Sequence, residues 1–128
     1  MITVFTPTYN RGYTLSRLYN SLLSQTYMDF EWLIIDDGSI DNTSMLVDSF
    51  ILENKIKVRY LKTGNGGKHR AINKGVALAK GEFFYIVDSD DYLPENALER
   101  IIFFMEQIKY NDSFAGVFGE IIVTVYNI

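Results

Sequence analysis

Short apolar runs alternate along the chain with longer segments in which apolar residues recur every three or four positions. The short runs are typical of strands. They occupy residues 2–6, 30–35, 56–61 and 83–87. The longer segments follow helical spacing, as Leu15, Leu18 and Leu22 do in the first of them. Strand and helix thus alternate four times, which predicts an α/β fold with a mainly parallel central sheet and helices on both faces.

The ends of the helical segments carry the residues that usually begin or end a helix. The segments cover residues 15–23, 46–51, 71–79 and 97–108. Asp41 or Asn42 is a candidate cap for the second helix. Gly81 would close the third at a C-cap position, and Pro94 suits the first turn of the fourth. Two further apolar segments are predicted strands, at residues 115–118 and 121–126. Trp32 lies in an apolar strand and is interpreted as a packing residue.

Three carboxylates lie within four residues at the end of the last parallel strand. Residues 88–91 read Asp-Ser-Asp-Asp and directly follow Val87. Burying such acids unpaired is costly, and a divalent cation is the simplest relief of their repulsion. Hard oxygen ligands favour Mg²⁺ or Mn²⁺, which can then hold a phosphorylated ligand. A solvated acidic turn before a helix is the alternative, and these four residues alone do not separate the two.

The loops that follow parallel strands meet at one edge of a sheet, where α/β proteins bind their ligands. The four loops of this chain are residues 6–11, 36–39, 64–68 and 88–91. Polar and small residues concentrate in them. We therefore expect Tyr9, Asp37 and Asp90 to converge around a single cleft.

Composition narrows the class of protein. The chain has 128 residues, 48% of them hydrophobic, which suits one globular domain with a core. A formal net charge of −4 argues against a general nucleic-acid binder. The chain has no cysteine, and no apolar stretch is long enough to predict a membrane-spanning helix. We expect a cytoplasmic domain, with a peripheral position at the inner face of the membrane as the alternative.

The net charge hides a basic segment. Eight Lys or Arg residues and no Asp or Glu lie between Lys55 and Lys80. A basic segment that faces carboxylates suits an anion bridged to the protein by a metal, although a solvated basic helix face is common. His69, the one histidine, is interpreted as a surface or phosphate-edge residue rather than as an acid or base.

Two familiar phosphate motifs fit poorly. Residues 64–69 (Gly-Asn-Gly-Gly-Lys-His) lack the glycine spacing and the hydroxyl of a nucleotide-triphosphatase loop. Asp88 and Asp90 also suggest a phosphatase of the haloacid-dehalogenase type, with Asp88 as nucleophile. That fold uses its first strand for the motif and needs a later Lys and further acids, whereas only 37 residues follow Asp91.

Five short motifs occur in order along the chain. They lie at residues 4–11, 33–39, 67–75, 79–82 and 87–91. Together they resemble the nucleotide-sugar-binding half of the inverting family 2 glycosyltransferases, over residues 2–112. The resemblance implies the GT-A fold, a Rossmann-like α/β/α sandwich. It also implies metal-dependent transfer of a sugar, with inversion, from a nucleotide-diphosphate donor.

The resemblance also implies roles for residues of the first two loops. Pro7, Thr8 and Tyr9 would wrap the base and ribose of the nucleotide, with Asn10 in the same nucleotide-binding segment. Asp37 would accept a hydrogen bond from N3–H of uracil, which makes a UDP-sugar the expected donor.

The later motifs would hold the metal and the diphosphate. Asp88, Ser89 and Asp90 match the Asp-x-Asp motif of the family. Asp90 would bind Mn²⁺ or Mg²⁺ directly, and Asp88 would hold the ribose or a metal-bound water, with Ser89 on the nucleotide. Asp91 matches an acid often found beside the motif. Lys68 would face the diphosphate.

The chain departs from the family pattern in its length. Transfer needs a general base on the opposite face of the sugar, which in this family lies well beyond the Asp-x-Asp motif. The catalytic base is unknown here, and only its place in the sequence supports Glu120, the one acid after Asp112. We expect residues 1–128 to form a single nucleotide-sugar-binding domain of a truncated glycosyltransferase.

The partners follow from the same reasoning. The acceptor would be an unknown saccharide, lipid-linked or protein hydroxyl, and exposed apolar surface where a second half would dock could drive homodimerisation. The alternative function is a catalytically incomplete nucleotide-binding or assembly domain that lacks the acceptor half.

Overall fold

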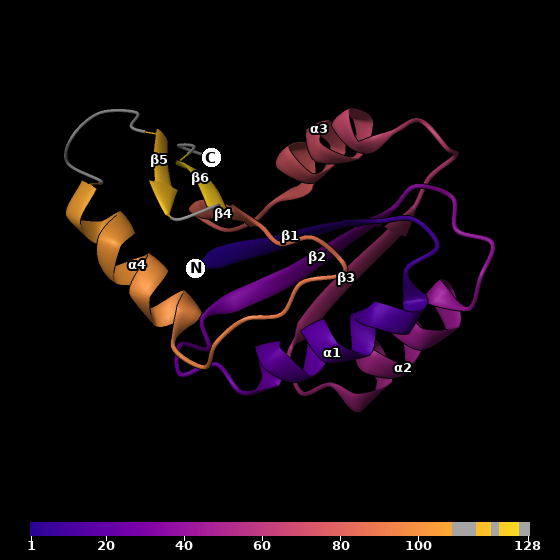
Figure 1. Cartoon of the computed structure of the whole chain (residues 1–128), viewed down its shortest axis with the longest axis horizontal. Helices are drawn as coiled ribbons and strands as arrows, with labels where there is room; N and C mark the ends of the chain where they lie inside the picture. The colour runs from indigo at the N-terminus through magenta and orange to yellow at the C-terminus, as the bar shows by residue number, and fades with distance from the viewer. Residues whose placement is uncertain (109–114, 119–120, 126–128) are drawn as a thin grey trace.

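The computed structural model describes residues 1–108, 115–118 and 121–125, which form one six-stranded sheet flanked by helices (Figure 1). The strands are β1 (Ile2–Thr8), β2 (Phe30–Asp36), β3 (Lys57–Lys62), β4 (Phe83–Ile86), β5 (Ala115–Phe118) and β6 (Ile121–Val125). Their order in the sheet is β3-β2-β1-β4-β6-β5. The first four strands pair in parallel, whereas β6 pairs antiparallel with β4 and β5. The predicted mainly parallel α/β sheet and its two last strands are confirmed.

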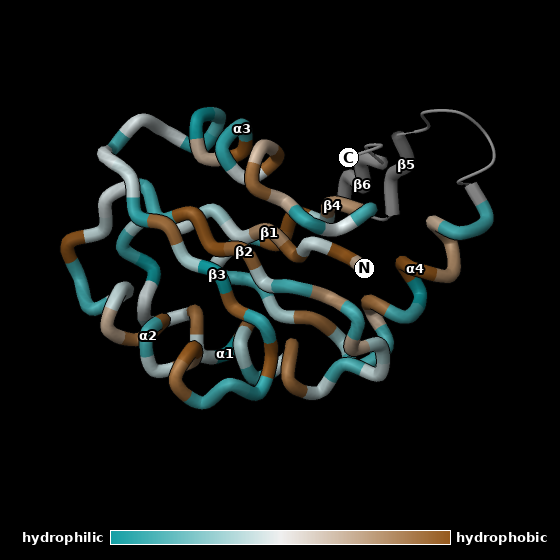
Figure 2. The backbone as a smooth tube through the Cα atoms, turned by 180° about the vertical axis from the view of Figure 1, so that it is seen from behind, coloured by the Kyte–Doolittle hydropathy of each residue, from teal (hydrophilic) through white to brown (hydrophobic). Residues whose placement is uncertain are grey.

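Helices cover both faces of the sheet. They are α1 (Gly12–Leu23), α2 (Thr43–Glu53), α3 (Lys68–Leu78) and α4 (Ala97–Ile108). In the view from behind, α3 lies on one side of the sheet and α1 and α2 lie on the other (Figure 2). None of the helices in the described ranges has the length and apolar character that crossing a bilayer requires.

Alternation along the strands divides the core into two apolar layers. The larger layer lies against α1, α2 and α4 and contains Ile2, Val4 and Trp32, whereas Phe5 belongs to the smaller layer beneath α3. Successive side chains of a strand point to opposite faces, so a strand buried on both faces reads as a continuous apolar run. Trp32 is fully buried, as its predicted packing role requires, and its indole N–H donates to the Thr6 hydroxyl at 2.9 Å.

The first strand is longer than the sequence pattern predicts. Pro7 and Thr8, which were assigned to a loop, extend β1 and pair in register with Ile35 and Asp36 of β2. Proline has no N–H to donate, so it interrupts a sheet unless that position needs no ladder bond. The last β1 residue paired with β4 is Phe5, so Pro7 lies beyond the end of that ladder. This extension carries the polypeptide to the cleft described below.

Two predicted helix boundaries are wrong. The third helix ends at Leu78, and Gly81 is not its cap: a Cβ on Gly81 would lie 2.5 Å from the backbone nitrogen of Thr3. The glycine permits close approach of the chain to β1. Pro94 precedes α4, which begins at Ala97. A tertiary contact thus explains Gly81, whereas Pro94 lies in the turn before α4, where its carbonyl accepts the N–H of Ala97 at 3.0 Å.

The predicted cap of the second helix is divided between the two candidates. Asn42 is the cap residue by position, but its side chain makes no capping hydrogen bond. The carboxylate of Asp41 instead accepts the backbone N–H of Thr43 at 3.1 Å. It also accepts the N–H of Gly12 at 3.1 Å, so this acid joins the starts of α1 and α2.

A buried carboxylate stabilises the end of the sheet opposite the cleft. Glu31 in β2 is 2% exposed and accepts hydrogen bonds from Arg59, the Thr3 hydroxyl and the backbone N–H of Lys80. Arg59 also donates to the carbonyl of Leu78 at 2.8 Å. A buried charge requires such partners, and this set ties β1, β2, β3 and the segment after α3 together.

Removing the guanidinium should therefore destabilise the fold. We expect Arg59→Ala to lower the free energy of unfolding by about 2 kcal/mol, because Glu31 loses its cationic partner but keeps two neutral donors. Urea denaturation followed by circular dichroism measures this loss. Lys57→Ala, on the same strand and exposed, is the control and should change stability by less than about 0.5 kcal/mol. Equal stability of the Arg59 variant and wild type would contradict the role given to the ion pair.

Candidate functional site

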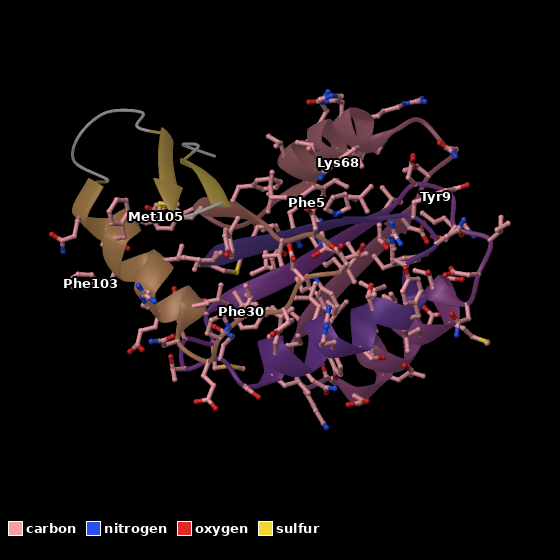
Figure 3. The ribbon with its side chains drawn as sticks, viewed as in Figure 1. Phe5, Tyr9, Phe30, Lys68, Phe103 and Met105 are labelled. Atoms are coloured by element: carbon pink, nitrogen blue, oxygen red, sulfur yellow. The ribbon has the colours of Figure 1, made fainter. Side chains whose placement is uncertain are left out.

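The carboxyl ends of β1, β2, β3 and β4 open into one cleft of about 320 Å³. The segments after β1, β2 and β4 contribute to its wall, together with the start of α3, the helix that follows β3. The lining residues are Pro7, Thr8, Tyr9, Arg11, Asp37, Lys68, Ala71, Asp88, Ser89 and Asp90. Figure 3 labels Tyr9 and Lys68 in this region, far from Phe103 on α4. The predicted convergence of Tyr9, Asp37 and Asp90 around a single cleft is confirmed.

One predicted contact residue lies behind the wall. Asn10 is not among the cleft-lining residues, although its neighbours Tyr9 and Arg11 are. Its N–H donates to the Ser39 hydroxyl and its side-chain oxygen accepts the N–H of Ile40, both at 2.8 Å. Asn10 adopts φ 52°, a left-handed conformation that asparagine tolerates better than most residues. It therefore joins the loops after β1 and β2 and sets the path of the chain beside Tyr9.

A buried carboxylate supports this junction from below. Asp36, at the end of β2, is fully buried and accepts the backbone N–H of Ser39 at 2.8 Å. Its other oxygen accepts the hydroxyl of Tyr60 on β3. Burial, followed by this hydrogen bond, raises the pKa of the Tyr60 phenol. The acid of the Asp-Asp-Gly-Ser turn that faces inward is thus structural, and Asp37 is the one that faces the cleft.

Asp37 holds the glycine loop that precedes α3. Its carboxylate accepts the N–H of Gly66 at 2.7 Å and the N–H of Gly67 at 3.0 Å. Gly38 follows it at φ 91°, in the left-handed region that glycine adopts without a steric penalty. Each carboxylate oxygen accepts about two hydrogen bonds. The oxygen that binds only Gly67 therefore retains capacity for a ligand donor.

The acidic run forms a compact group at the end of β4. Oxygen atoms of Asp88, Asp90 and Asp91 lie within 4.8 Å of one another. Partial burial, followed by the charges of Asp90 and Asp88, raises the pKa of the Asp91 carboxyl. This mutual repulsion is the cost that a cation would remove. Three carboxylates in such proximity suit Mg²⁺ or Mn²⁺, both of which prefer hard oxygen ligands.

Helix α1 fixes the backbone of this acidic turn. The Thr14 hydroxyl donates to the carbonyl of Ser89 at 2.6 Å, and the Arg17 guanidinium donates to the carbonyl of Asp90 at 2.6 Å. Arg17 also stacks over the ring of Tyr92, 4.8 Å from its centroid. The backbone of the turn thus has a defined shape, while the side chains of Asp90 and Asp91 are exposed. No sequence pattern indicates these roles of Thr14 and Arg17, because their partners are backbone atoms more than 70 residues away.

A basic residue of α3 faces the acids in the cleft, and two more follow it outside the cleft lining. Lys68, the first residue of α3, places its ammonium 3.0 Å from an oxygen of Asp88. His69 and Arg70 follow in the same first turn and are exposed. Helix N-termini favour negative charge, so a lysine and an arginine there are electrostatically unfavourable unless an anion binds nearby.

Several other residues bear on the site. Arg11, the last residue of the first motif, lines the cleft but is not among the predicted site residues. The Thr8 hydroxyl is buried and has no hydrogen-bond partner among the described residues, so a ligand group or a water would stabilise it. Glu120 lies outside the described residues, and His69 is not a cleft-lining residue.

The layered sheet with its binding edge is the architecture of a GT-A glycosyltransferase domain. Residues 3–127 match the model of the family described as Glycosyl transferase family 2. The chain belongs to this family.

Relatives in sequence carry the same domain within longer proteins. The glycosyltransferase GlyG of Streptococcus pneumoniae is 39% identical over 114 residues, which are 88% of this chain and 36% of GlyG. The chondroitin synthase of Pasteurella multocida is 37% identical over 99 residues, 77% of this chain and 10% of the synthase. The chain thus spans about a third of GlyG and a smaller part of the synthase.

Solved structures support the fold. The structure of Staphylococcus aureus TarS 1–349 in complex with UDP-GlcNAc superposes with a TM-score of 0.77 at 32% identity, over 84% of this chain and 32% of that one. A mannosyltransferase from Pyrobaculum calidifontis, in complex with GDP-Man and Mn²⁺, gives a TM-score of 0.69 at 28% identity, over 73% and 28% of the two chains. The fold is therefore shared with proteins that bind nucleotide sugars.

The hydrogen bonds that Asp37 accepts from Gly66 and Gly67 can be tested directly. We expect Asp37→Ala to accelerate amide hydrogen exchange at Gly66 and Gly67 by about tenfold, because both N–H groups lose their acceptor. Exchange measured by NMR reports each amide separately. Asp48→Ala, an exposed acid on α2, is the control and should leave both amides unchanged. Unchanged exchange in the Asp37 variant would show that the two bonds do not order the loop.

Proposed function

We propose that this domain binds a UDP-sugar together with a divalent cation and serves an inverting glycosyltransferase that passes the sugar to an acceptor hydroxyl. The observation that carries the proposal is the single cleft in which Tyr9, Asp37, Lys68 and Asp90 meet. Family membership supports glycosyl transfer, and the likeness to TarS with UDP-GlcNAc supports a uridine donor.

The base would lie against the first two loops. Tyr9 is 44% exposed at the cleft, so its ring has a face available for stacking. Pro7 and Thr8 would complete the wall around base and ribose, with Asn10 holding the loop in place. The free capacity on the Asp37 carboxylate suits N3–H of uracil. Cytosine has an acceptor at that position, which the same carboxylate would repel.

The metal would be held by Asp90 and Asp88, with Asp91 beside them and Ser89 facing the nucleotide. The oxygen-only donor set fits Mn²⁺ or Mg²⁺, and the related mannosyltransferase structure contains Mn²⁺. A bound cation would neutralise the charge that develops on the diphosphate leaving group. Lys68 supplies a second positive group on the other side of the cleft.

The rest of the reaction is proposed at a coarser level. An inverting transfer needs a base that removes the acceptor proton as the sugar bond breaks. We assign no catalytic base within the described residues. The acceptor would be a saccharide, lipid-linked or protein hydroxyl, and residues 1–128 would be the donor-binding unit. Exposed apolar side chains, among them Leu52 and Phe103, suit contact with further protein, including a second copy.

Nucleotide and metal binding should depend on each other. We expect UDP at about a hundred times its Kd to stabilise the domain by about 2.7 kcal/mol when Mn²⁺ or Mg²⁺ is present, and to have little effect with a chelator. CDP and GDP should shift the melting temperature less than UDP does. A thermal-shift panel of nucleotides with and without metal measures this, and no shift with any pair would refute the proposal.

Variants separate the two halves of the site. Asp90→Ala should abolish the metal-dependent shift, because it removes a proposed direct ligand. Asp37→Asn should weaken UDP binding by about tenfold while the metal effect persists, because the amide can hold Gly66 but loses charge toward uracil N3–H. Asp48→Ala serves as the control of equal charge change. If both site variants bound UDP–Mn²⁺ like wild type, the residue assignments would be wrong.

Turnover distinguishes an enzyme from a binding domain that has kept the fold. With UDP-GlcNAc and Mn²⁺, an active transferase should release UDP by transfer to an acceptor or by slow hydrolysis, and Asp90→Ala should remove that release. A coupled assay for UDP detects either route. Metal-dependent binding without any UDP release would favour the non-catalytic alternative.

A further inference from the structure

An ion pair spans the cleft between its basic and acidic walls. The Lys68 ammonium lies 3.0 Å from an oxygen of Asp88, and about half of each side chain is exposed. Asp88 is one of the two proposed metal ligands. The ammonium thus neutralises part of the acidic cluster at the place where a divalent cation would bind.

The position of Lys68 is set from the other end of the cleft. Lys68 directly follows Gly67, which has φ 91° and donates its N–H to Asp37. Asp37 also holds the neighbouring Gly66. The residue proposed to read the base therefore anchors the loop from which Lys68 reaches Asp88.

We infer that Lys68 is the resident counter-ion of the acidic cluster and transfers to the diphosphate when metal and nucleotide bind. The inference rests on the proposed function and adds a linkage between its two ligands. Without nucleotide, Lys68 competes with the cation for Asp88. With nucleotide, the diphosphate supplies the anion that Lys68 then pairs with, and the cation binds without that competitor.

Electrostatics gives the linkage its sign. A divalent cation beside Asp88 repels an ammonium that has no other anion to approach, so the metal alone binds weakly. Among the described residues, the other cleft-lining cation is Arg11, which donates to the hydroxyl of Tyr13. A coupling free energy is reciprocal, so the metal strengthens diphosphate binding by the same factor as the diphosphate strengthens metal binding.

The test compares Lys68→Ala with wild type in two separate titrations. Mn²⁺ alone, followed by electron paramagnetic resonance, should bind the variant about threefold more tightly, because an exposed ion pair of modest strength no longer competes. UDP and inorganic pyrophosphate, titrated calorimetrically at saturating Mn²⁺, should bind the variant about tenfold more weakly. The opposite directions of the two effects are the signature of exchange.

The matched control is Lys74→Ala, which removes the same charge from an exposed position later in α3. Lys74 is not among the cleft-lining residues, so both affinities should change by less than about twofold. Thermal melts of all variants establish that each is folded.

The outcomes separate this inference from the proposed function. Equal or weaker Mn²⁺ binding by Lys68→Ala, or no Mn²⁺ binding by any variant, overturns the inference whatever UDP does. Unchanged or tighter UDP and pyrophosphate binding by that variant also overturns it. If pyrophosphate and Mn²⁺ show the two opposite effects but wild type does not bind UDP, the exchange stands and the proposed uridine donor fails.

Discussion

The parallel pairing of β1 with both β2 and β4 is the constraint on which the site depends. Parallel strands end at the same edge, so the loops after them meet although they are distant in the sequence. Residues that follow β1, β2 and β4, together with the start of α3 after β3, then line one cleft. Pro7 contributes by extending β1 beyond its last pair with β4, which brings Tyr9 to the rim.

Polar groups beneath the cleft and in its wall hold the loops in position. Asp36 binds Ser39, Ser39 binds Asn10, and Asp37 binds the two glycines before α3. Asp36 is fully buried, and a buried carboxylate is tolerated only when donors surround it, whereas Asp37 lines the cleft. Both sets of contacts constrain the loop conformations. The flexible glycine segment is thereby tied to a rigid strand end, which gives Lys68 a defined position.

Charge is distributed across the cleft in a pattern that favours a positive metal ion bound together with a negative diphosphate. Acids crowd together at the end of β4, and basic residues crowd at the N-terminus of α3. Each group is unfavourable by itself, since like charges repel and a helix N-terminus repels cations. A cation bound with a diphosphate relieves both. Before such binding, the ion pair between Lys68 and Asp88 gives partial relief.

The sequence by itself determined the alternation of strands and helices, the parallel sheet, the ligand edge and the acidic run. These features follow from local periodicity and from the rule that parallel strands share an edge. Only the tertiary structure decided which polar residue faces the ligand and which supports it. Asp36 and Asp37 are adjacent and identical in type, yet one is buried beneath the loop and the other lines the cleft. Gly81 was predicted to cap a helix, but its lack of a side chain instead permits close contact with the backbone of Thr3. Such roles depend on partners far away in the chain, which periodicity and propensity do not encode.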